Sequence, residues 1–177
     1  MAGSIPNSKL DLTIVILTYN ESKHIERCIK SVKTISSKVI IVDSYSTDNT
    51  IDIAKANGAV VFQNKFINQA KQFQWALDNC KINTEWTMKL DADEYLLDDL
   101  KEELITKLPN ISINITLLYL KLRVLFMSKW IKRGYYPLVL PRVFRTKYGY
   151  MEDSWMDEHI RVSKGESLIL KNDFVDE

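Results

Sequence analysis

Short aliphatic runs alternate with amphipathic segments through the first part of the chain. Residues 12–17 form an unbroken run of aliphatic and β-branched residues, which is typical of a strand buried on both faces of a parallel sheet. Three more strands are predicted at residues 39–42, 59–62 and 86–90. Apolar side chains at helical spacing predict four helices, at residues 25–32, 51–56, 67–80 and 97–108.

Strands that alternate with helices of this length predict an α/β fold with a mostly parallel, doubly wound sheet flanked by helices. After Pro109 the pattern changes, because residues 113–124 alternate and glycines and prolines interrupt the segment from 134 to 149. We therefore expect residues 12–108 and 109–177 to be two halves of one domain. The second half is expected to be mixed, loop-rich and packed against the first sheet, and residues 1–11 to form a flexible N-terminal segment.

Composition narrows the classes of function. The 177 residues are enough for one buried core, and 24 Lys and Arg against 23 Asp and Glu give a formal charge of +1. Such a balance creates no overall field that favours nucleic acid, so no nucleic-acid partner is expected. No signal peptide or membrane span is evident, which predicts a cytoplasmic protein. Cys28 and Cys80 lack metal-ligand spacing and are expected to be reduced packing residues.

Polar clusters directly follow three of the predicted strands, at residues 18–21, 43–48 and 91–94. The carboxyl ends of such strands are where an open α/β sheet binds ligands. The first two clusters could also be turns and helix caps. In the third, Asp91 and Asp93 lie beside Glu94, and like charges so close repel unless a cation lies between them. Mg²⁺ or Mn²⁺ suits such carboxylates, and the alternative is a solvated acidic loop before a helix.

Residues 13–21 (TIVILTYNE), 43–50 (DSYSTDNT) and 90–94 (LDADE) resemble the successive motifs of family 2 glycosyltransferases with the GT-A fold. Residues 69–77 and 141–145 also resemble the branch of that family that builds bacterial lipopolysaccharide and other surface glycans. The resemblance covers most of residues 12–162. It implies a nucleoside diphosphate sugar as donor, and Mn²⁺ or Mg²⁺ as cofactor.

The resemblance also implies roles for individual residues. The donor nucleotide would lie against Thr18, Asn20, Glu21, Asp43 and Ser44, with Asp48 supporting that loop. Asp91 would contact the ribose or a metal-bound water, and Asp93 would bind the metal. The chain departs from the branch at Phe73 and Gln74, where Arg and Asn are usual, so Lys71 is a candidate to supply the missing charge.

An inverting transfer needs a base that removes the proton of the acceptor hydroxyl. The resemblance implies that this base is Glu158 or Asp157; we favour Glu158, and His159 is an alternative by its intrinsic pKa. Arg142 and Arg145 lie on a short predicted strand and are expected to share one face. They are candidates to contact phosphate or the acceptor, and the alternative is surface ion pairing.

Together these observations predict a metal-dependent, inverting glycosyltransferase that moves a sugar, with UDP as the expected nucleotide, to a glycan or lipid-linked acceptor of bacterial surface polysaccharide. The chain is expected to be truncated, with peripheral contact to the inner face of the cell membrane through a missing C-terminal region. Two alternatives remain open: a non-catalytic nucleotide-binding module, and a phosphoryl-transfer enzyme that uses Asp91 as nucleophile.

Overall fold

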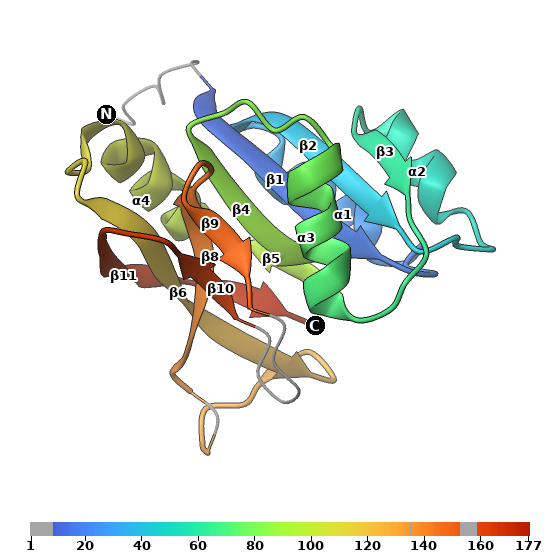
Figure 1. Cartoon of the computed structure of the whole chain (residues 1–177). Helices are drawn as coiled ribbons and strands as arrows, with labels where there is room; N and C mark the ends of the chain where they lie inside the picture. Colours follow the sequence, from blue (N-terminus) through green and yellow to red (C-terminus); the bar gives the residue numbers. More distant parts are fainter. Residues whose placement is uncertain (1–8, 135, 153–158) are drawn as a thin grey trace.

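A computed structural model describes residues 9–134, 136–152 and 159–177 (Figure 1). The strands are β1 (Leu10–Thr18), β2 (Ser36–Asp43), β3 (Val60–Gln63), β4 (Trp86–Asp91), β5 (Glu94–Leu96), β6 (Ile115–Phe126), β7 (Lys129–Trp130), β8 (Leu138–Arg145), β9 (Gly149–Met151), β10 (Ile160–Val162) and β11 (Glu166–Asp176). The helices are α1 (Ile25–Val32), α2 (Thr50–Ala56), α3 (Gln69–Asn79) and α4 (Asp98–Lys107), which continues into the 3-10 turn η1 (Leu108–Asn110).

The first half of the chain forms the parallel part of the main sheet. Its strands lie in the order β3-β2-β1-β4, and each neighbouring pair is parallel. β1 is central, and its apolar side chains from Leu12 to Ile16 are fully buried, as expected for a strand covered on both faces. The prediction of a mostly parallel sheet flanked by helices is confirmed.

The second half continues the same sheet beyond β4. The order runs on as β4-β8-β6-β11-β5, with β8 antiparallel to both β4 and β6, and β11 parallel to β6 but antiparallel to β5. This differs from the expectation that the second half packs against the first sheet, because β8 hydrogen-bonds directly to β4. Only Ala92 and Asp93 separate β4 from β5, so the far end of the sheet curls back to the tip of β4.

Helices cover both faces of the sheet (Figure 1). Side chains from α1, α2 and α4 form the larger core cluster on one face, together with the inner residues of β1 and β4. On the other face α3 packs with the β9–β10 hairpin through Phe73, Ala76, Met151 and Ile160. Cys28 and Cys80 are free and buried, as expected. Within the described ranges, no helix has the length and apolarity needed to cross a bilayer.

Local sequence explains most element ends. The Asn68 side chain caps α3 by accepting a hydrogen bond from the backbone N–H of Lys71 at 2.8 Å. α2 ends at Asn57 and Gly58, and Gly58 has a φ of 85°, a conformation that glycine adopts readily. β1 begins at Leu10, inside the segment expected to be flexible, because Leu10 is buried and its N–H donates to the carbonyl of Ile35.

Candidate functional site

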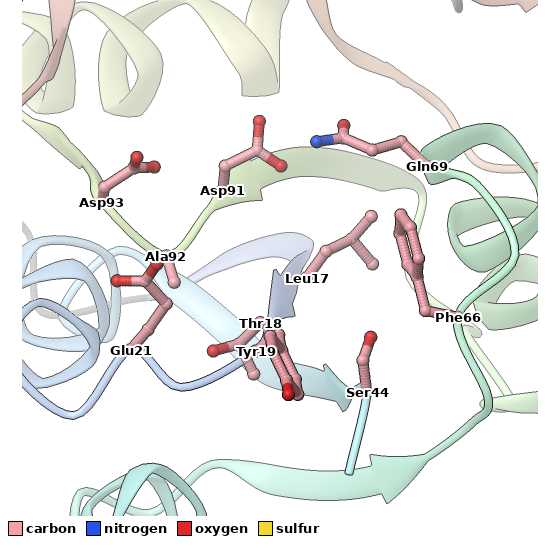
Figure 2. A pocket seen from close by; sticks show the side chains of 10 residues that line it. All are labelled: Leu17, Thr18, Tyr19, Glu21, Ser44, Phe66, Gln69, Asp91, Ala92 and Asp93. Atoms are coloured by element: carbon pink, nitrogen blue, oxygen red, sulfur yellow. The ribbon is translucent and has the colours of Figure 1, made fainter. Parts of the chain in front are cut away.

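The carboxyl ends of β1, β2 and β4 surround a pocket of about 430 Å³ (Figure 2). This is the edge where the sheet topology places ligands, and the three polar clusters meet here. The pocket is lined by Leu17, Thr18, Tyr19, Glu21, Ser44, Phe66, Gln69, Asp91, Ala92 and Asp93. Of the predicted site residues, the structure therefore brings Thr18, Glu21, Ser44, Asp91 and Asp93 together.

Thr18, the last residue of β1, lies in the wall of this pocket. Only 5% of its surface is exposed, and its hydroxyl has no hydrogen-bond partner among the described residues. A buried hydroxyl left unpaired costs roughly 1–3 kcal/mol. The hydroxyl of Thr18 can therefore form a new hydrogen bond to a ligand.

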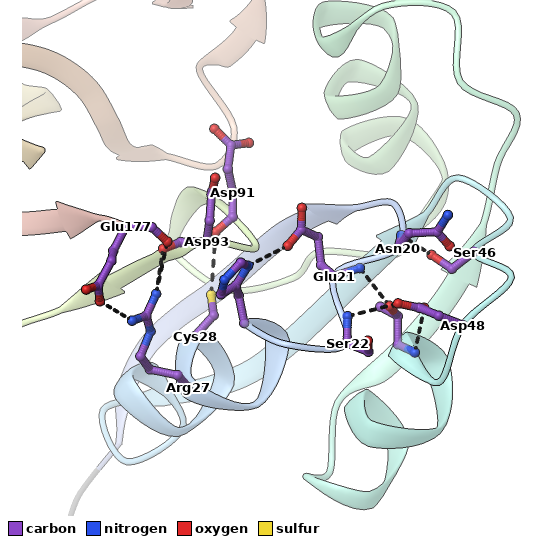
Figure 3. A network of polar contacts seen from close by, with 12 residues as sticks. Asn20, Glu21, Ser22, Arg27, Cys28, Ser46, Asp48, Asp91, Asp93 and Glu177 are labelled. Atoms are coloured by element: carbon purple, nitrogen blue, oxygen red, sulfur yellow. Dashed lines mark hydrogen bonds and ion pairs between the residues drawn. The ribbon is translucent and has the colours of Figure 1, made fainter. Parts of the chain in front are cut away.

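The loops that follow β1 and β2 are bonded to each other (Figure 3). The Asn20 backbone N–H donates to the hydroxyl of Ser46 at 2.8 Å, and the Asn20 side-chain oxygen accepts from the N–H of Thr47 at 2.8 Å. The Ser22 N–H donates to Asp48 at 3.1 Å. Asn20 has a φ of 54°, which Asn tolerates better than most residues. Asn20 and Asp48 thus hold the two loops together, and neither lines the pocket.

Asp43 and Asp48 are both engaged within the second loop. Asp43 is fully buried and accepts hydrogen bonds from the N–H of Ser46 at 2.9 Å and from Gln63 at 3.2 Å. The hydrogen bond from the Thr50 hydroxyl is the main cause that lowers the pKa of Asp48 to about 2. Both carboxylates fix the loop that carries Ser44 to the pocket, and their contact with a nucleotide stays a prediction.

The Asp91 carboxylate is held by two basic side chains. The Lys89 ammonium lies 2.9 Å from one carboxylate oxygen, and Arg142 lies 3.7 Å from the other. Burial on its own would raise the pKa of Asp91, but the charges of Lys89 and Arg142 outweigh burial and lower it. Lys89 also donates to Gln69 at 3.2 Å, and Figure 2 shows Gln69 and Asp91 directed toward one another. Asp91 is therefore an ionised, fixed acceptor at the pocket.

Glu94 and Arg142 form a buried ion pair behind the pocket. The other carboxylate oxygen of Glu94 accepts from the N–H of Asp91 at 2.8 Å. Burial, reinforced by Asp91 and opposed by Arg142, raises the pKa of Glu94 to about 7. Arg142 thus links β8 to the carboxylates at the end of β4. The structure places this predicted residue at the site, where its partners are Glu94 and Asp91.

Asp93 has a different electrostatic environment from Asp91. No Lys or Arg in the described part of the chain pairs with its carboxylate. Burial first, and then the charges of Asp176, Asp91 and Glu21, raise the pKa of Asp93. A cation at Asp93 would remove this repulsion.

The residues around Asp93 fit a divalent ion that a ligand helps to hold. Among the described residues, no group of three or more His, Cys, Asp or Glu side chains is arranged to hold a metal without other ligands. Mg²⁺ is commonly bound through one or two carboxylates, waters and substrate phosphates. The spacing of the two aspartates predicted that a metal neutralises both, whereas Lys89 and Arg142 already neutralise Asp91.

The expectation that Arg142 and Arg145 share one face is wrong. Side chains three residues apart on a strand point to opposite faces. Arg145 pairs with Glu85, donates to the carbonyl of Ile115 at 3.0 Å, and lies 4.5 Å from the centre of the Trp86 ring. Glu85 and Trp86 are at the amino end of β4, opposite to the end that borders the pocket, so Arg145 lies away from the pocket.

One further predicted residue lies away from the pocket, and two lie outside the described residues. Lys71 is exposed in the first turn of α3 and does not line the pocket. Asp157 and Glu158 lie outside the described residues, so the choice of base stays a prediction. Phe73 is fully buried and packs edge-on against Phe144, with ring centres 6.2 Å apart; packing accounts for this departure from the usual Arg.

Lys89 is a site residue that was not predicted from the sequence. A signal for it existed, because a lysine inside a strand buried on both faces requires a partner, and Asp91 is two residues further on the same face. Tyr19, Phe66 and Gln69 also line the pocket. Tyr19 and Phe66 are more than half exposed, and an exposed aromatic ring beside a pocket can stack on a flat ligand.

Comparison with solved structures identifies the class of fold. Residues 1–349 of TarS from S. aureus superpose with a TM-score of 0.65 at 15% identity, over 96% of this chain and 60% of that one. Glucosyl-3-phosphoglycerate synthase from Mycobacterium tuberculosis, in complex with Mn²⁺, UDP and glucosyl-3-phosphoglycerate, superposes with a TM-score of 0.58 at 17% identity, over 77% of this chain and 57% of that one. The fold is the GT-A fold of glycosyltransferases.

Sequence comparison gives the family. The glycosyl transferase family 2 model matches residues 13–118, and the chain belongs to this family. An uncharacterized glycosyltransferase of Rickettsia bellii is 41% identical over 93 residues, 52% of this chain and 31% of the relative. The lipopolysaccharide core biosynthesis glycosyltransferase LpsC of Rhizobium meliloti is 33% identical over 99 residues, 53% of this chain and 36% of LpsC. The match thus spans about a third of these relatives' length.

Proposed function

We propose that this chain carries the donor-binding site of an inverting, metal-dependent glycosyltransferase that uses a UDP-linked sugar. The main supporting observation is Asp93, whose carboxylate faces the pocket without a basic partner in the described chain while burial and neighbouring acids raise its pKa. A diphosphate held through a divalent cation fits that environment. Thr18, Glu21, Ser44 and Asp91 would bind the nucleotide from the surrounding wall.

In the proposed reaction an oxygen of the acceptor attacks the anomeric carbon of the sugar. The bond from that carbon to the diphosphate oxygen breaks, and its electron pair leaves with the nucleoside diphosphate. The proton of the acceptor hydroxyl passes to Glu158, with Asp157 as the second candidate. A bound Mn²⁺ or Mg²⁺ would supply positive charge against the departing diphosphate. Lys89 and Arg142 keep Asp91 ionised, so that it can accept a hydrogen bond from the nucleotide.

We further infer a glycan or lipid-linked acceptor in the synthesis of a bacterial surface polysaccharide, at the cytoplasmic face of the membrane. The similarity to LpsC supports this assignment, and the synthase that contains Mn²⁺ and UDP supports the cofactor and the nucleotide. Family membership gives no support to the alternative in which Asp91 is a phosphoryl-transfer nucleophile.

Metal-dependent nucleotide binding tests the proposal. UDP with Mn²⁺ is expected to raise the midpoint of thermal unfolding, since a ligand that binds only the folded state stabilises it. UDP with a chelator is expected to give a much smaller shift. A screen of UDP, GDP, CDP and dTDP under the same conditions identifies the base. An equal shift with and without metal, or no shift with any nucleotide, contradicts the proposal.

The variant Asp93→Asn tests whether Asp93 is responsible for the metal-dependent part of nucleotide binding. It is expected to lose most of the Mn²⁺-dependent part of the shift, because the amide removes the negative charge next to the metal. Asp52→Asn is the matched control, because Asp52 is an exposed aspartate of α2. Release of UDP from a UDP-sugar by the parent chain, and its loss in Asp93→Asn, distinguishes an active transferase from a non-catalytic binding module.

A further inference from the structure

The hairpin between β6 and β7 has an unusual turn. Met127 and Ser128 join the two strands, with φ values of 51° and 58°. Two positive φ values are characteristic of a type I′ turn, where Asn and Gly are strongly preferred. Methionine is rare in this backbone conformation, so local backbone preference does not explain Met127.

Burial does not explain the apolar residues of this turn either. Met127 is 82% exposed and Phe126, directly before it, is 66% exposed. These two neighbouring side chains belong to neither core cluster of the described residues. Exposed apolar groups that lie together at a strained turn indicate an interaction rather than packing.

Basic side chains follow these two apolar residues in the chain: Lys129 pairs with Phe126 across the turn, and Lys132 and Arg133 come directly after β7. Lys129, Lys132 and Arg133 are all exposed, and none forms an ion pair in the part of the chain that the structure describes. The Lys132 ammonium lies 4.6 Å from the centre of the Trp130 ring. Acids of β11 and the residue after it lie on the near side of the hairpin, where Glu177 accepts a hydrogen bond from the Ser128 hydroxyl at 3.1 Å and Asp173 pairs with Arg123. Lys129, Lys132 and Arg133 are thus the exposed cations of this region that no described acid neutralises.

The hairpin lies at the same edge of the sheet as the pocket. β6 ends next to the end of β11, where Val124 pairs with Asp176, and Asp176 pairs in turn with Glu94 on β5. Glu94 directly follows Asp93 of the pocket. In Figure 1 the β6–β7 hairpin extends away from the layers of helices. A flat surface that touched the hairpin would therefore lie on the pocket side of the molecule.

We propose that the hairpin tip, meaning Phe126, Met127, Lys129, Lys132 and Arg133, docks onto an anionic lipid bilayer. The two apolar side chains would enter the boundary between headgroups and acyl chains, and the three cations would bind anionic headgroups. Two apolar side chains provide too little area for a stable protein interface, which buries about 1,000 Å² or more. Membrane docking would bring the pocket close to a lipid-linked acceptor. Only this role rests on the proposed function.

Vesicle co-sedimentation of the whole chain tests the proposal. The chain is expected to sediment with vesicles of phosphatidylcholine mixed with phosphatidylglycerol, and to bind much less to phosphatidylcholine alone. High salt is expected to weaken binding, because the electrostatic part is screened. Equal binding to both kinds of vesicle, or no binding to either, overturns the proposal. Self-association of the chain that is lost when Phe126 is replaced would also overturn the proposal, because the hairpin would then bind a second copy of the chain and not a bilayer.

Two double variants assign the binding to the hairpin tip. Phe126→Thr with Met127→Asn removes both apolar side chains and places Asn where the turn favours it, and about tenfold weaker binding to anionic vesicles is expected. Its matched control is Ile113→Thr with Ile169→Thr, at two isoleucines that are also more than half exposed. Lys129→Glu with Arg133→Glu is expected to weaken binding at least about tenfold, and Lys9→Glu with Lys55→Glu is its control.

The outcomes separate this proposal from the proposed function. UDP binding in the presence of Mn²⁺ is expected to be unchanged in both hairpin variants, because neither pair of residues lines the pocket. Normal vesicle binding by both hairpin variants sinks the membrane proposal and leaves the transferase untouched. If the chain binds vesicles but binds no nucleotide, the membrane proposal stands and the proposed transferase function is contradicted.

Discussion

At the scale of single residues, the Thr18 hydroxyl lowers the stability of the folded chain and is available to hydrogen-bond a ligand. Its hydroxyl is buried beside the pocket and has no partner among the described residues. Thr18→Val replaces the hydroxyl with a methyl group of similar size, so the variant is expected to be more stable by about 1 kcal/mol. UDP affinity is expected to fall. Urea unfolding and calorimetric titration measure the two effects.

Thr13→Val is the matched control for this change. Thr13 is also buried in β1, but its hydroxyl accepts a hydrogen bond from Thr84 at 2.7 Å. The variant is expected to lose about 1 kcal/mol of stability and to bind UDP normally. A Thr18→Val protein that is destabilised and binds UDP normally would show that its hydroxyl has a partner within the protein.

Arg142 is the second residue with a specific prediction. Arg142→Met leaves Glu94 and Asp91 without their shared cation, and breaking such a buried pair is expected to cost about 3–5 kcal/mol of unfolding free energy. The double variant Arg142→Met with Glu94→Gln is expected to recover part of that loss. Arg161→Met removes an ion pair to Glu152 that is nearly half exposed and is expected to cost less than about 1 kcal/mol. Denaturant unfolding of the four proteins checks this.

At the scale of elements, the loops after β1 and β2 depend on the ionised carboxylate of Asp48. Its pKa is about 2 in the folded chain against a usual value of 3.8. The charged form therefore adds stability above about pH 4, and this contribution is lost as the pH falls through 2. The stability difference between the parent and Asp48→Asn is expected to shrink over that range. Urea midpoints between pH 5 and pH 2 measure it.

Elements with a strong local pattern were predictable from the sequence, and elements defined by distant pairing were not. β1 and β2 carry runs of aliphatic and β-branched residues, and β4 is apolar apart from Thr87, Lys89 and Asp91, so their positions follow from the sequence pattern. β5 has only three residues and one of them is Glu94. It is a strand because β11, which is distant in sequence, pairs with it. The same limit applies to the site, since Asp91 and Asp93 were found from local spacing but the pairing of Arg142 with Glu94 was not.

At the scale of the whole molecule, one sheet joins the two halves of the chain. β4 pairs with β8 through three residue pairs, from Trp86↔Arg145 to Met88↔Val143, and the larger core cluster includes side chains from both halves. We therefore predict a single cooperative unfolding transition, as small single domains usually show. Urea curves followed by far-ultraviolet circular dichroism and by tryptophan fluorescence should coincide. Two separate midpoints would mean that residues 12–108 and 109–177 unfold independently.

The mixed second half shows what limited the prediction of the overall shape. The alternation in residues 113–124 is typical of a strand, and β6 covers most of this range. No local signal specified that β8 would pair with β4, because register in a mixed sheet depends on contacts between distant segments.

The pairing of β5 with β11 has a consequence for synthesis of the protein. Asp93 lies in the link between β4 and β5, and β5 is held by Phe174, Val175 and Asp176. Before residues 174–176 have been synthesised, β5 lacks this partner strand. The link that carries Asp93 is therefore expected to take its final position only late in synthesis, and the proposed donor site is expected to form with it.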